Sequence, residues 1–206
     1  GHTVPCTIVA AVDCTGHGVP GAFMSLVGNN LLNNIVNIRH ITDPKKILEE
    51  LHKGVVRALK KDQQESGTVD GMDITLCAID TGKMRLEFSS TGRSLIFIRG
   101  DVSQRIKVGT QPVGFVGKRN TEFTKQEIAL AAGDTFYIFT DGFCDQFGEK
   151  EDEKFMEHHF EKLLLDNRHL SMPAQAELLE RTLDEWKGTL PQLDDILVIG
   201  IRMGRG

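Results

Sequence analysis

The sequence predicts an α+β fold, and three observations support that expectation. A short buried strand is followed by two amphipathic helices, a block of short strands fills the middle of the chain, and two further helices and a last strand close it. Helices and strands gathered in separate stretches are typical of proteins whose amphipathic helices cover an antiparallel sheet. No repeat, low-complexity stretch or linker interrupts the 206 residues, so we expect one domain spanning residues 1–206.

The first third of the chain predicts a strand and two helices. A continuous apolar, β-branched run at 7–12 is typical of a buried strand, which delivers Asp13 at its C-terminal end. After a glycine-rich turn, apolar residues at helical spacing over 20–39 predict the first helix. Thr42-Asp43-Pro44 is typical of an N-cap followed by proline at the first helical position, so a second helix starts here and ends in the polar stretch 62–71.

The remaining helices and strands are predicted by a change in the spacing of apolar residues along the chain. Short apolar runs separated by turn residues predict an antiparallel meander, with strands at 74–79, 84–88, 95–98, 102–108, 123–130 and 136–139. Beyond it the sequence becomes charged, which predicts helices over 152–165 and 171–186. A last strand is expected over 196–201.

Composition excludes several classes of function. The net charge is −5 and no Lys/Arg run stands out, which argues against nucleic-acid binding. No apolar stretch approaches the ~20 residues that cross a bilayer, and the start lacks the pattern of a signal peptide, so we expect no membrane insertion of this segment.

The four cysteines suggest neither a metal site nor disulfides. Cys6, Cys14, Cys77 and Cys144 are scattered without CxxC pairing, so a zinc ribbon and a disulfide framework are both disfavoured. We expect them to be small buried apolar residues in a protein of the reducing cytoplasm.

Acidic residues stand at the ends of three predicted core strands. Asp13 and Asp141 each follow a strand, and Asp194-Asp195 precedes the last one. Carboxylates gathered at one point repel one another unless a cation neutralises them, and oxygen ligands suit Mg²⁺ or Mn²⁺. Metal-assisted hydrolysis is therefore one interpretation. The other is that all three are ordinary turn, loop and capping residues.

A glycine-rich segment at 15–21 leaves several roles open. It precedes a helix, as a phosphate-binding loop would, but it matches neither a Walker A loop nor GxGxxG, so nucleotide binding is weakly supported. His17 within it could be a general acid, a metal ligand or a turn residue.

Three motifs in order carry a family resemblance. The run Asp13-Cys14-Thr15-Gly16-His17-Gly18-Val19-Pro20-Gly21-Ala22-Phe23-Met24-Ser25 resembles the signature of the SpoIIE-type bacterial branch of the metal-dependent protein phosphatase 2C family. Thr140-Asp141-Gly142 resembles the TDG segment of that family, and Asp194-Asp195-Ile196 resembles its terminal DD motif. Gly71-Met72-Asp73-Ile74 and Trp186 also fall where this branch often has similar residues. The resemblance covers nearly the whole chain.

The resemblance implies a four-layer αββα sandwich of two antiparallel sheets flanked by helices, with two Mn²⁺ or Mg²⁺ ions. The implied activity is hydrolysis of phosphoserine and phosphothreonine in proteins by a metal-activated water. The resemblance further implies that Asp13 bridges both metals, that the backbone carbonyl of Cys14 completes one coordination shell, and that Asp141 and Asp194 hold the second ion. Asp195 stands where other members carry Asn, so it is expected to support the ligands by hydrogen bonding rather than to bind metal.

The sequence departs from the family pattern in two respects. A strand pair with a Gly-Asp motif normally precedes the DCTGHG segment, whereas only twelve residues precede Asp13 here and none is acidic. We therefore expect an N-terminally truncated domain whose exposed sheet edge invites pairing. The histidine that acts as an acid in eukaryotic relatives follows the motif Asp at a shorter spacing than His17 does.

The resemblance also implies partners. Substrates of this branch are typically phosphorylated anti-anti-sigma regulators of the STAS type, and a sensor domain usually precedes the phosphatase domain. We thus expect a cytoplasmic bacterial signalling domain, and the output domain of a membrane-anchored sensor is one form that the resemblance allows. Arg93 is either a phosphate contact or a solvated surface residue. The rival functions are a degenerate phosphatase fold that binds a regulator without catalysis and a hydrolase of small phosphate compounds.

Overall fold

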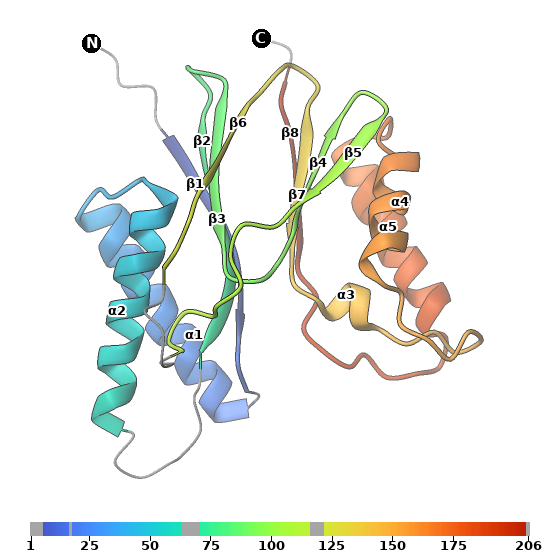
Figure 1. Cartoon of the computed structure of the whole chain (residues 1–206). Coiled ribbons are helices and arrows are strands. Elements are labelled where there is room, and N and C mark those ends of the chain that lie inside the picture. The colour runs from blue at the N-terminus through green and yellow to red at the C-terminus, as the bar shows by residue number, and fades with distance from the viewer. Residues whose placement is uncertain (1–5, 17, 63–70, 116–121, 205–206) are drawn as a thin grey trace. The chain divides into compact units, whose positions relative to one another are not determined.

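A computed structural model describes residues 6–16, 18–62, 71–115 and 122–204 (Figure 1). The chain forms two compact units. Unit 1 comprises the chain up to residue 93 together with 107–130, and unit 2 comprises 94–106 together with the chain from 131 onward. The backbone therefore passes from one unit to the other three times. The expectation of a single domain over residues 1–206 stays a prediction.

Unit 1 is built on a four-stranded antiparallel sheet in the order β1-β2-β3-β6. Its strands are β1 (Cys6–Cys14), β2 (Met72–Asp80), β3 (Arg85–Ser90) and β6 (Gln126–Ala129). The first two strands pair over nine residues each, and this register sets Asp13 directly opposite Asp73.

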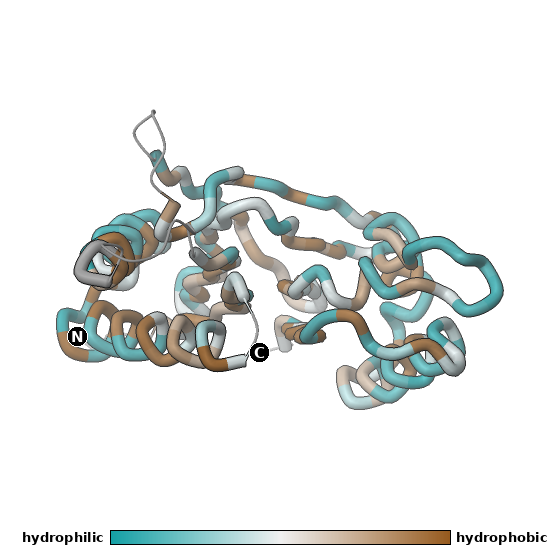
Figure 2. The backbone as a smooth tube through the Cα atoms, turned by 90° about the horizontal axis from the view of Figure 1, so that it is seen from below, coloured by the Kyte–Doolittle hydropathy of each residue, from teal (hydrophilic) through white to brown (hydrophobic). Residues whose placement is uncertain are grey.

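Helices cover one face of this sheet (Figure 1). They are α1 (Gly18–Asn33), which continues into a π-helical turn η1 (Asn34–Ile38), and α2 (Pro44–Asp62). Alternate strand residues such as Ile74 and Leu76 pack with Leu48 and Leu51 in one buried cluster. Along the helical coils of the chain, hydrophobic and hydrophilic residues alternate in Figure 2, as amphipathic helices require. The two predicted helices are confirmed, with α1 and η1 together occupying the first.

The predicted cap of the second helix is confirmed as well. The Lys46 backbone N–H donates to the Asp43 carboxylate at 3.2 Å, and Pro44 is the first residue of α2. Lys125 also contacts this carboxylate at 2.7 Å. Although burial acts in the opposite direction, the hydrogen bonds to Asp43 leave the pKa of its carboxyl below the ordinary value.

Residue His52 of α2 links the helix to the segment that follows β5. Its Nδ1 accepts a hydrogen bond from the Gly114 backbone N–H at 3.2 Å, and its ring meets Phe123 edge to face. Burial lowers the pKa of His52. Because the unfolded chain then binds the proton more readily than the folded chain, stability is fully present above the ordinary histidine pKa of about 6.5 and is lost as the pH falls below it.

We expect the melting temperature (Tm) to fall between pH 7.5 and pH 5.5 in a manner that depends on His52. Loss of the acceptor costs about 1 kcal/mol, or roughly 2–4 °C in Tm. Thermal unfolding at several pH values, followed by circular dichroism, measures this effect. The variant His52→Asn should lose that part of the pH dependence, whereas His169→Asn, at an exposed position, should retain it. A variant His52→Asn with the parent's pH profile would contradict the assignment.

Unit 2 is built on a second antiparallel sheet, in the order β5-β4-β7-β8. Its strands are β4 (Leu95–Arg99), β5 (Val102–Ile106), β7 (Thr135–Phe139) and β8 (Val198–Arg202). The single meander expected from the strand block is therefore wrong. The chain leaves the first sheet after β3 and returns to it with β6, because β6 pairs with β3 and β7 pairs with β4.

The described residues of unit 2 form three helices, which are labelled in Figure 1. They are α3 (Gly142–Asp145), α4 (Glu157–Asp166) and α5 (Met172–Lys187). The Ser171 hydroxyl accepts the Ala174 N–H at 3.3 Å and caps α5. The predicted helix at 152–165 begins only at Glu157, because Asp152 and Met156 adopt left-handed backbone angles with φ of 52° and 69°.

Aromatic residues dominate the core between the helices and the sheet of unit 2. The Phe143 ring meets Phe155 edge to face at 5.1 Å between centroids and lies tilted against Phe160 at 4.9 Å. Phe155 in turn meets Trp186 edge to face at 5.1 Å. Together with Phe139 they form one buried cluster. The TDG segment is thus anchored in this core through Phe143, two residues after Asp141.

All four cysteines are thiols rather than disulfides; Cys77 and Cys144 are buried, and Cys6 and Cys14 are partly so. Burial raises the pKa of the Cys77 thiol to about 12. Within the described parts of the chain, no helix is both long enough and apolar enough to span a membrane.

Candidate functional site

In unit 1, the candidate residue Asp13 lies next to the C-terminal end of β1. Its neighbours Val12 and Cys14 pack toward the helices. Because successive strand residues point to opposite faces, the Asp13 side chain points to the face of the sheet that the helices leave open. Asp73 on β2 is its direct partner in the register, so two carboxylates lie side by side on that face.

Arg93 lies within reach of both carboxylates. Its Nη2 is 3.5 Å from Asp13 Oδ2 and 3.4 Å from Asp73 Oδ2, and each of the three side chains is only about a quarter exposed. The interpretation of Arg93 as a solvated surface residue is therefore wrong. The guanidinium offsets the repulsion between the two acids that the β1–β2 register brings together.

The glycines after Asp13 allow the chain to turn tightly into α1. Gly16 has a φ of 93°, in the left-handed region that favours glycine. A Cβ on Gly21 would lie 2.4 Å from the Gly16 carbonyl oxygen, so only glycine fits at this point of the first helical turn. The Thr15 N–H donates to the Gly71 carbonyl at 2.9 Å and ties the turn to the start of β2.

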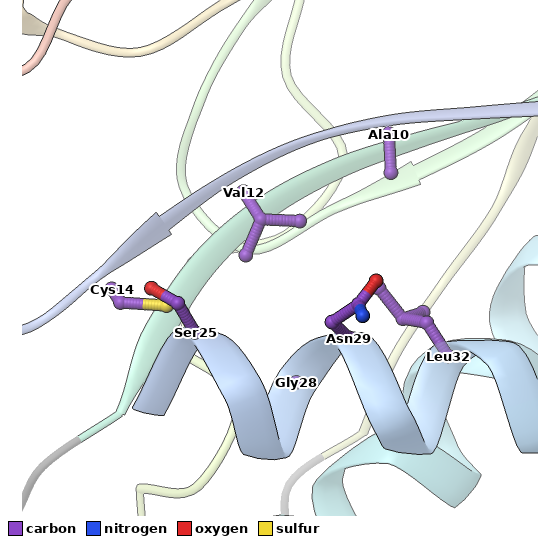
Figure 3. A pocket seen from close by; sticks show the side chains of 7 residues that line it. All are labelled: Ala10, Val12, Cys14, Ser25, Gly28, Asn29 and Leu32. Carbon is purple, nitrogen blue, oxygen red and sulfur yellow. The ribbon is translucent and has the colours of Figure 1, made fainter. Parts of the chain in front are cut away.

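The Cys14 side chain faces away from Asp13, into a cavity of about 300 Å³ between β1 and α1. Figure 3 shows its thiol beside the Ser25 hydroxyl, with Val12, Ala10, Asn29 and Leu32 completing the walls. Burial raises the pKa of the Cys14 thiol, and the Ser25 hydroxyl partly opposes this shift. Of the Cys14 atoms, the backbone carbonyl is the one with the hard-oxygen character expected of a Mg²⁺ or Mn²⁺ ligand. His17 lies outside the described residues.

In unit 2, the segments that carry Asp141 and Asp194-Asp195 are held against each other. The Thr140 hydroxyl donates to the Asp195 carbonyl and accepts the Leu197 N–H, both at 3.0 Å. The Thr140 N–H donates to the Leu197 carbonyl, also at 3.0 Å. Three hydrogen bonds around one buried threonine therefore fix the start of the TDG segment to the residues that follow the DD motif.

The carboxylates of unit 2 differ in exposure. Asp141 is half-buried at the start of α3, where its carbonyl accepts the Asp145 N–H at 2.8 Å, whereas Asp194 and Asp195 are exposed. The Asp195 N–H donates to the Asp194 carboxylate at 2.8 Å. Gln146 steadies the loop before them, because its side chain bonds to Pro191 O at 3.1 Å and to Leu193 N at 3.2 Å.

We expect the substitution Thr140→Val to loosen this arrangement. Valine has the same shape but leaves the Leu197 N–H without its partner, at a cost of about 2 kcal/mol, or roughly 4–8 °C in Tm. Differential scanning calorimetry measures the change. Thr140→Ser, which retains the hydroxyl, should lose clearly less. Equal losses in the two variants would show that the hydroxyl does not carry the effect.

Sequence reasoning identified the carboxylates but did not single out the residues that hold them. Thr140 belongs to the quoted TDG segment and Gln146 follows that segment, yet nothing in the sequence reveals the hydrogen bonds of either residue to the loop 191–197. Asp73 was noted only as part of a family-like stretch, and its pairing with Asp13 needs the strand register. Among the residues that the structure describes, no group of three or more His, Cys, Asp or Glu side chains is gathered closely enough to hold a metal ion.

Two antiparallel sheets with flanking helices, together with carboxylates beside their strand ends, define the class of PP2C-like phosphatase domains. The family described as Stage II sporulation protein E (SpoIIE) matches residues 5–204. The chain belongs to this family, which confirms the resemblance stated from its motifs. Comparison with curated protein sequences gave no match.

Solved structures agree with the family. The SiaA-PP2C domain of Pseudomonas aeruginosa is 31% identical, with a TM-score of 0.85 over 95% of this chain and 75% of that one. The PP2C phosphatase domain of SpoIIE from Bacillus subtilis, solved with a fragment of its regulatory domain, is 19% identical, with a TM-score of 0.70 over 96% of this chain and 54% of that one. The Ser-Thr phosphatase MsPP from Mycobacterium smegmatis is 17% identical, with a TM-score of 0.64 over 97% and 91%. At 19% and 17% identity, the last two structural similarities establish the fold alone.

Proposed function

We propose that this chain is a metal-dependent phosphatase of phosphoserine and phosphothreonine in proteins. In this reaction water attacks phosphorus, the bond to the seryl or threonyl oxygen breaks, and the products are the free hydroxyl and inorganic phosphate. The observation that carries the proposal is the match of residues 5–204 to a family whose solved relatives include PP2C phosphatase domains.

The proposed ligands are those expected from the motifs. Asp13, the Cys14 backbone carbonyl, Asp141 and Asp194 would hold the metal ions, and Asp195 would support these ligands by hydrogen bonding. When bound, Mn²⁺ or Mg²⁺ supplies an activated water and neutralises charge on the phosphoryl group.

The residues present fit such ions chemically. All proposed donors are carboxylate or carbonyl oxygens, the ligands that Mg²⁺ and Mn²⁺ prefer. Asp13 already attracts a guanidinium, which supports a site suited to positive charge. The hydrogen bonds of Thr140 support a role in holding the Asp141 and Asp194 segments in register with each other. The chain's own contribution is thus to keep its carboxylates in fixed positions.

For the substrate we propose a phosphorylated bacterial regulator of the anti-anti-sigma (STAS) type, with a sensor domain as the controlling partner and the cytoplasm as the compartment. The solved relative from Bacillus subtilis includes a fragment of a regulatory domain, and this chain spans 54% of it. This supports a phosphatase domain that works beside a second, regulatory part.

Hydrolysis of a phosphoserine peptide, with Mn²⁺ added or chelated, tests the proposal. We expect turnover only with the metal, and faster turnover on phosphopeptides than on phosphorylated metabolites. Faster turnover on the metabolites would favour the small-molecule hydrolase. Absence of both turnover and Mn²⁺ uptake in a folded chain would overturn the proposal in favour of a phosphatase fold that only binds its regulatory partner.

A further inference from the structure

The ion pairs of Arg93 join two acids of which only one is a proposed metal ligand. Asp13 and Asp73 are direct neighbours across β1 and β2, and the same nitrogen of Arg93 lies 3.4–3.5 Å from both. Like charges that face each other directly across two strands destabilise the pair. A cation at this point is therefore required electrostatically, and in the structure the guanidinium supplies it.

Arg93 reaches this position because the preceding residues are clamped to β2. The Thr91 hydroxyl donates to Asp73 Oδ1 at 3.1 Å and accepts the Ile74 N–H at 2.8 Å. The Thr91 N–H donates to the Ile74 carbonyl at 3.0 Å. Thr91 is 1% exposed, so these bonds are shielded from water. Asp73 is thus oriented by Thr91 on one oxygen and contacts Arg93 with the other.

We propose that Arg93 is an internal counter-ion that competes with a divalent metal ion for Asp13, and that Asp73 is the positioning residue that keeps Arg93 in place. This inference rests on the proposed function, in which Asp13 binds metal. A divalent ion at Asp13 and a guanidinium on the same carboxylate repel each other. Metal uptake therefore requires Arg93 to give up its contact with Asp13, and Asp73 retains it nearby.

The competition makes metal affinity lower than the carboxylates alone would provide. The three side chains carry one net negative charge together, and removal of Arg93 leaves two. Within a few ångströms and at the effective dielectric of a partly buried site, one additional unit of charge changes the binding of a divalent ion by about tenfold or more. Arg93 thus sets the metal concentration at which the site fills.

Isothermal titration calorimetry with Mn²⁺ on the 206-residue chain tests this inference. We expect Arg93→Gln to bind Mn²⁺ about tenfold more tightly than the parent. Arg93→Lys keeps the charge but loses the planar fork, so its affinity should lie between the two. Arg39→Gln is the matched control, because it removes a guanidinium that pairs with Glu50 at 2.8 Å and should leave the affinity unchanged.

Thermal unfolding without metal provides a second measurement. With EDTA present, Arg93→Gln should melt a few degrees below the parent, because Asp13 and Asp73 then face each other without the guanidinium that contacts both. Saturating Mn²⁺ should raise the Tm of Arg93→Gln by more than that of the parent, since tighter binding stabilises more. A residue with a merely structural role would lower Tm without tightening Mn²⁺ binding. If Arg93→Gln does not fold, Arg93→Lys provides the comparison.

The variant Asp13→Asn distinguishes a failure of the proposed competition by Arg93 from a failure of the assignment of Asp13 as a metal ligand. Weaker Mn²⁺ binding by Asp13→Asn, combined with equal or weaker binding by Arg93→Gln, would overturn the competition while leaving the proposed function intact. Mn²⁺ binding that Asp13→Asn does not alter would instead overturn the assignment of Asp13, and the competition with it.

Discussion

The substitution Asp141→Asn is expected to lower Mn²⁺-dependent hydrolysis of a phosphoserine peptide by at least about a hundredfold. Asparagine keeps the size of the side chain but removes the negative charge of a proposed ligand. The fold should survive, because the contact that starts α3 runs from the Asp145 N–H to the backbone carbonyl of residue 141, which the variant retains. Initial rates with Mn²⁺ and with EDTA measure the loss.

Asp166→Asn is the matched control for this experiment. Asp166 lies at the end of α4 and pairs with Lys162 at 2.6 Å, with both side chains more than half exposed. The control removes the same charge from the same unit, and it should keep the activity of the parent. Retained turnover in Asp141→Asn, with a circular dichroism spectrum like that of the parent, would show that Asp141 is no metal ligand.

Gly142→Ala is expected to destabilise the fold most among the substitutions considered. A Cβ at this position would lie 2.5 Å from the Asp195 carbonyl oxygen and 2.9 Å from Ile196 Cγ1. Backbone atoms cannot move aside as a flexible side chain does, so we expect a loss of about 3 kcal/mol, or roughly 6–12 °C in Tm. Since the displaced carbonyl is the one that Thr140 holds, hydrolysis should fall together with stability.

Gly204→Ala provides the comparison for Gly142→Ala. Apart from its chain neighbours, none of the described residues has an atom within 4 Å of a Cβ on Gly204, so the same added methyl group should leave Tm within about a degree of the parent. Calorimetry on the two variants separates close packing from the general effect of replacing a glycine. A variant Gly142→Ala as stable as Gly204→Ala would contradict the close approach of the TDG and DD segments.

Short-range sequence patterns predicted the helices and strands well, but they could not predict which strands pair with each other. The cap at Asp43 depends on a neighbour three residues away, and it was foreseen. The assignment of strands to the two sheets was not foreseen. The strand β6 pairs with β3, although β6 begins 36 residues after the end of β3. Nothing in the short-range sequence pattern distinguishes that pairing from a meander.

In the candidate site, too, the sequence predicted individual residues but not the contacts between residues that are distant in the chain. Asp13, Asp141 and Asp194 could be singled out, since each stands beside an apolar run that reads as a strand. The contact of Arg93 with Asp13 depends on the register of β1 on β2, where a shift of one residue would turn Asp73 to the other face. The bonds of Thr140 to the loop after Asp194 join residues 55 and 57 positions apart, beyond the reach of motif reasoning.

The three passages of the backbone between the units bear on how the chain folds during synthesis. The sheet of unit 1 is complete only when β6 has emerged, some 36 residues after β3 and with two strands of unit 2 already made. The ribosome therefore releases β4 and β5 before β7, the second neighbour of β4, exists, and exposed strand edges of this kind attract other chains. No uninterrupted fragment contains all the strands of one unit without also containing a strand of the other. Because the segments of the two units alternate along the chain, dissection of this protein calls for paired fragments, or for a new linker between the two segments of one unit, rather than simple truncation.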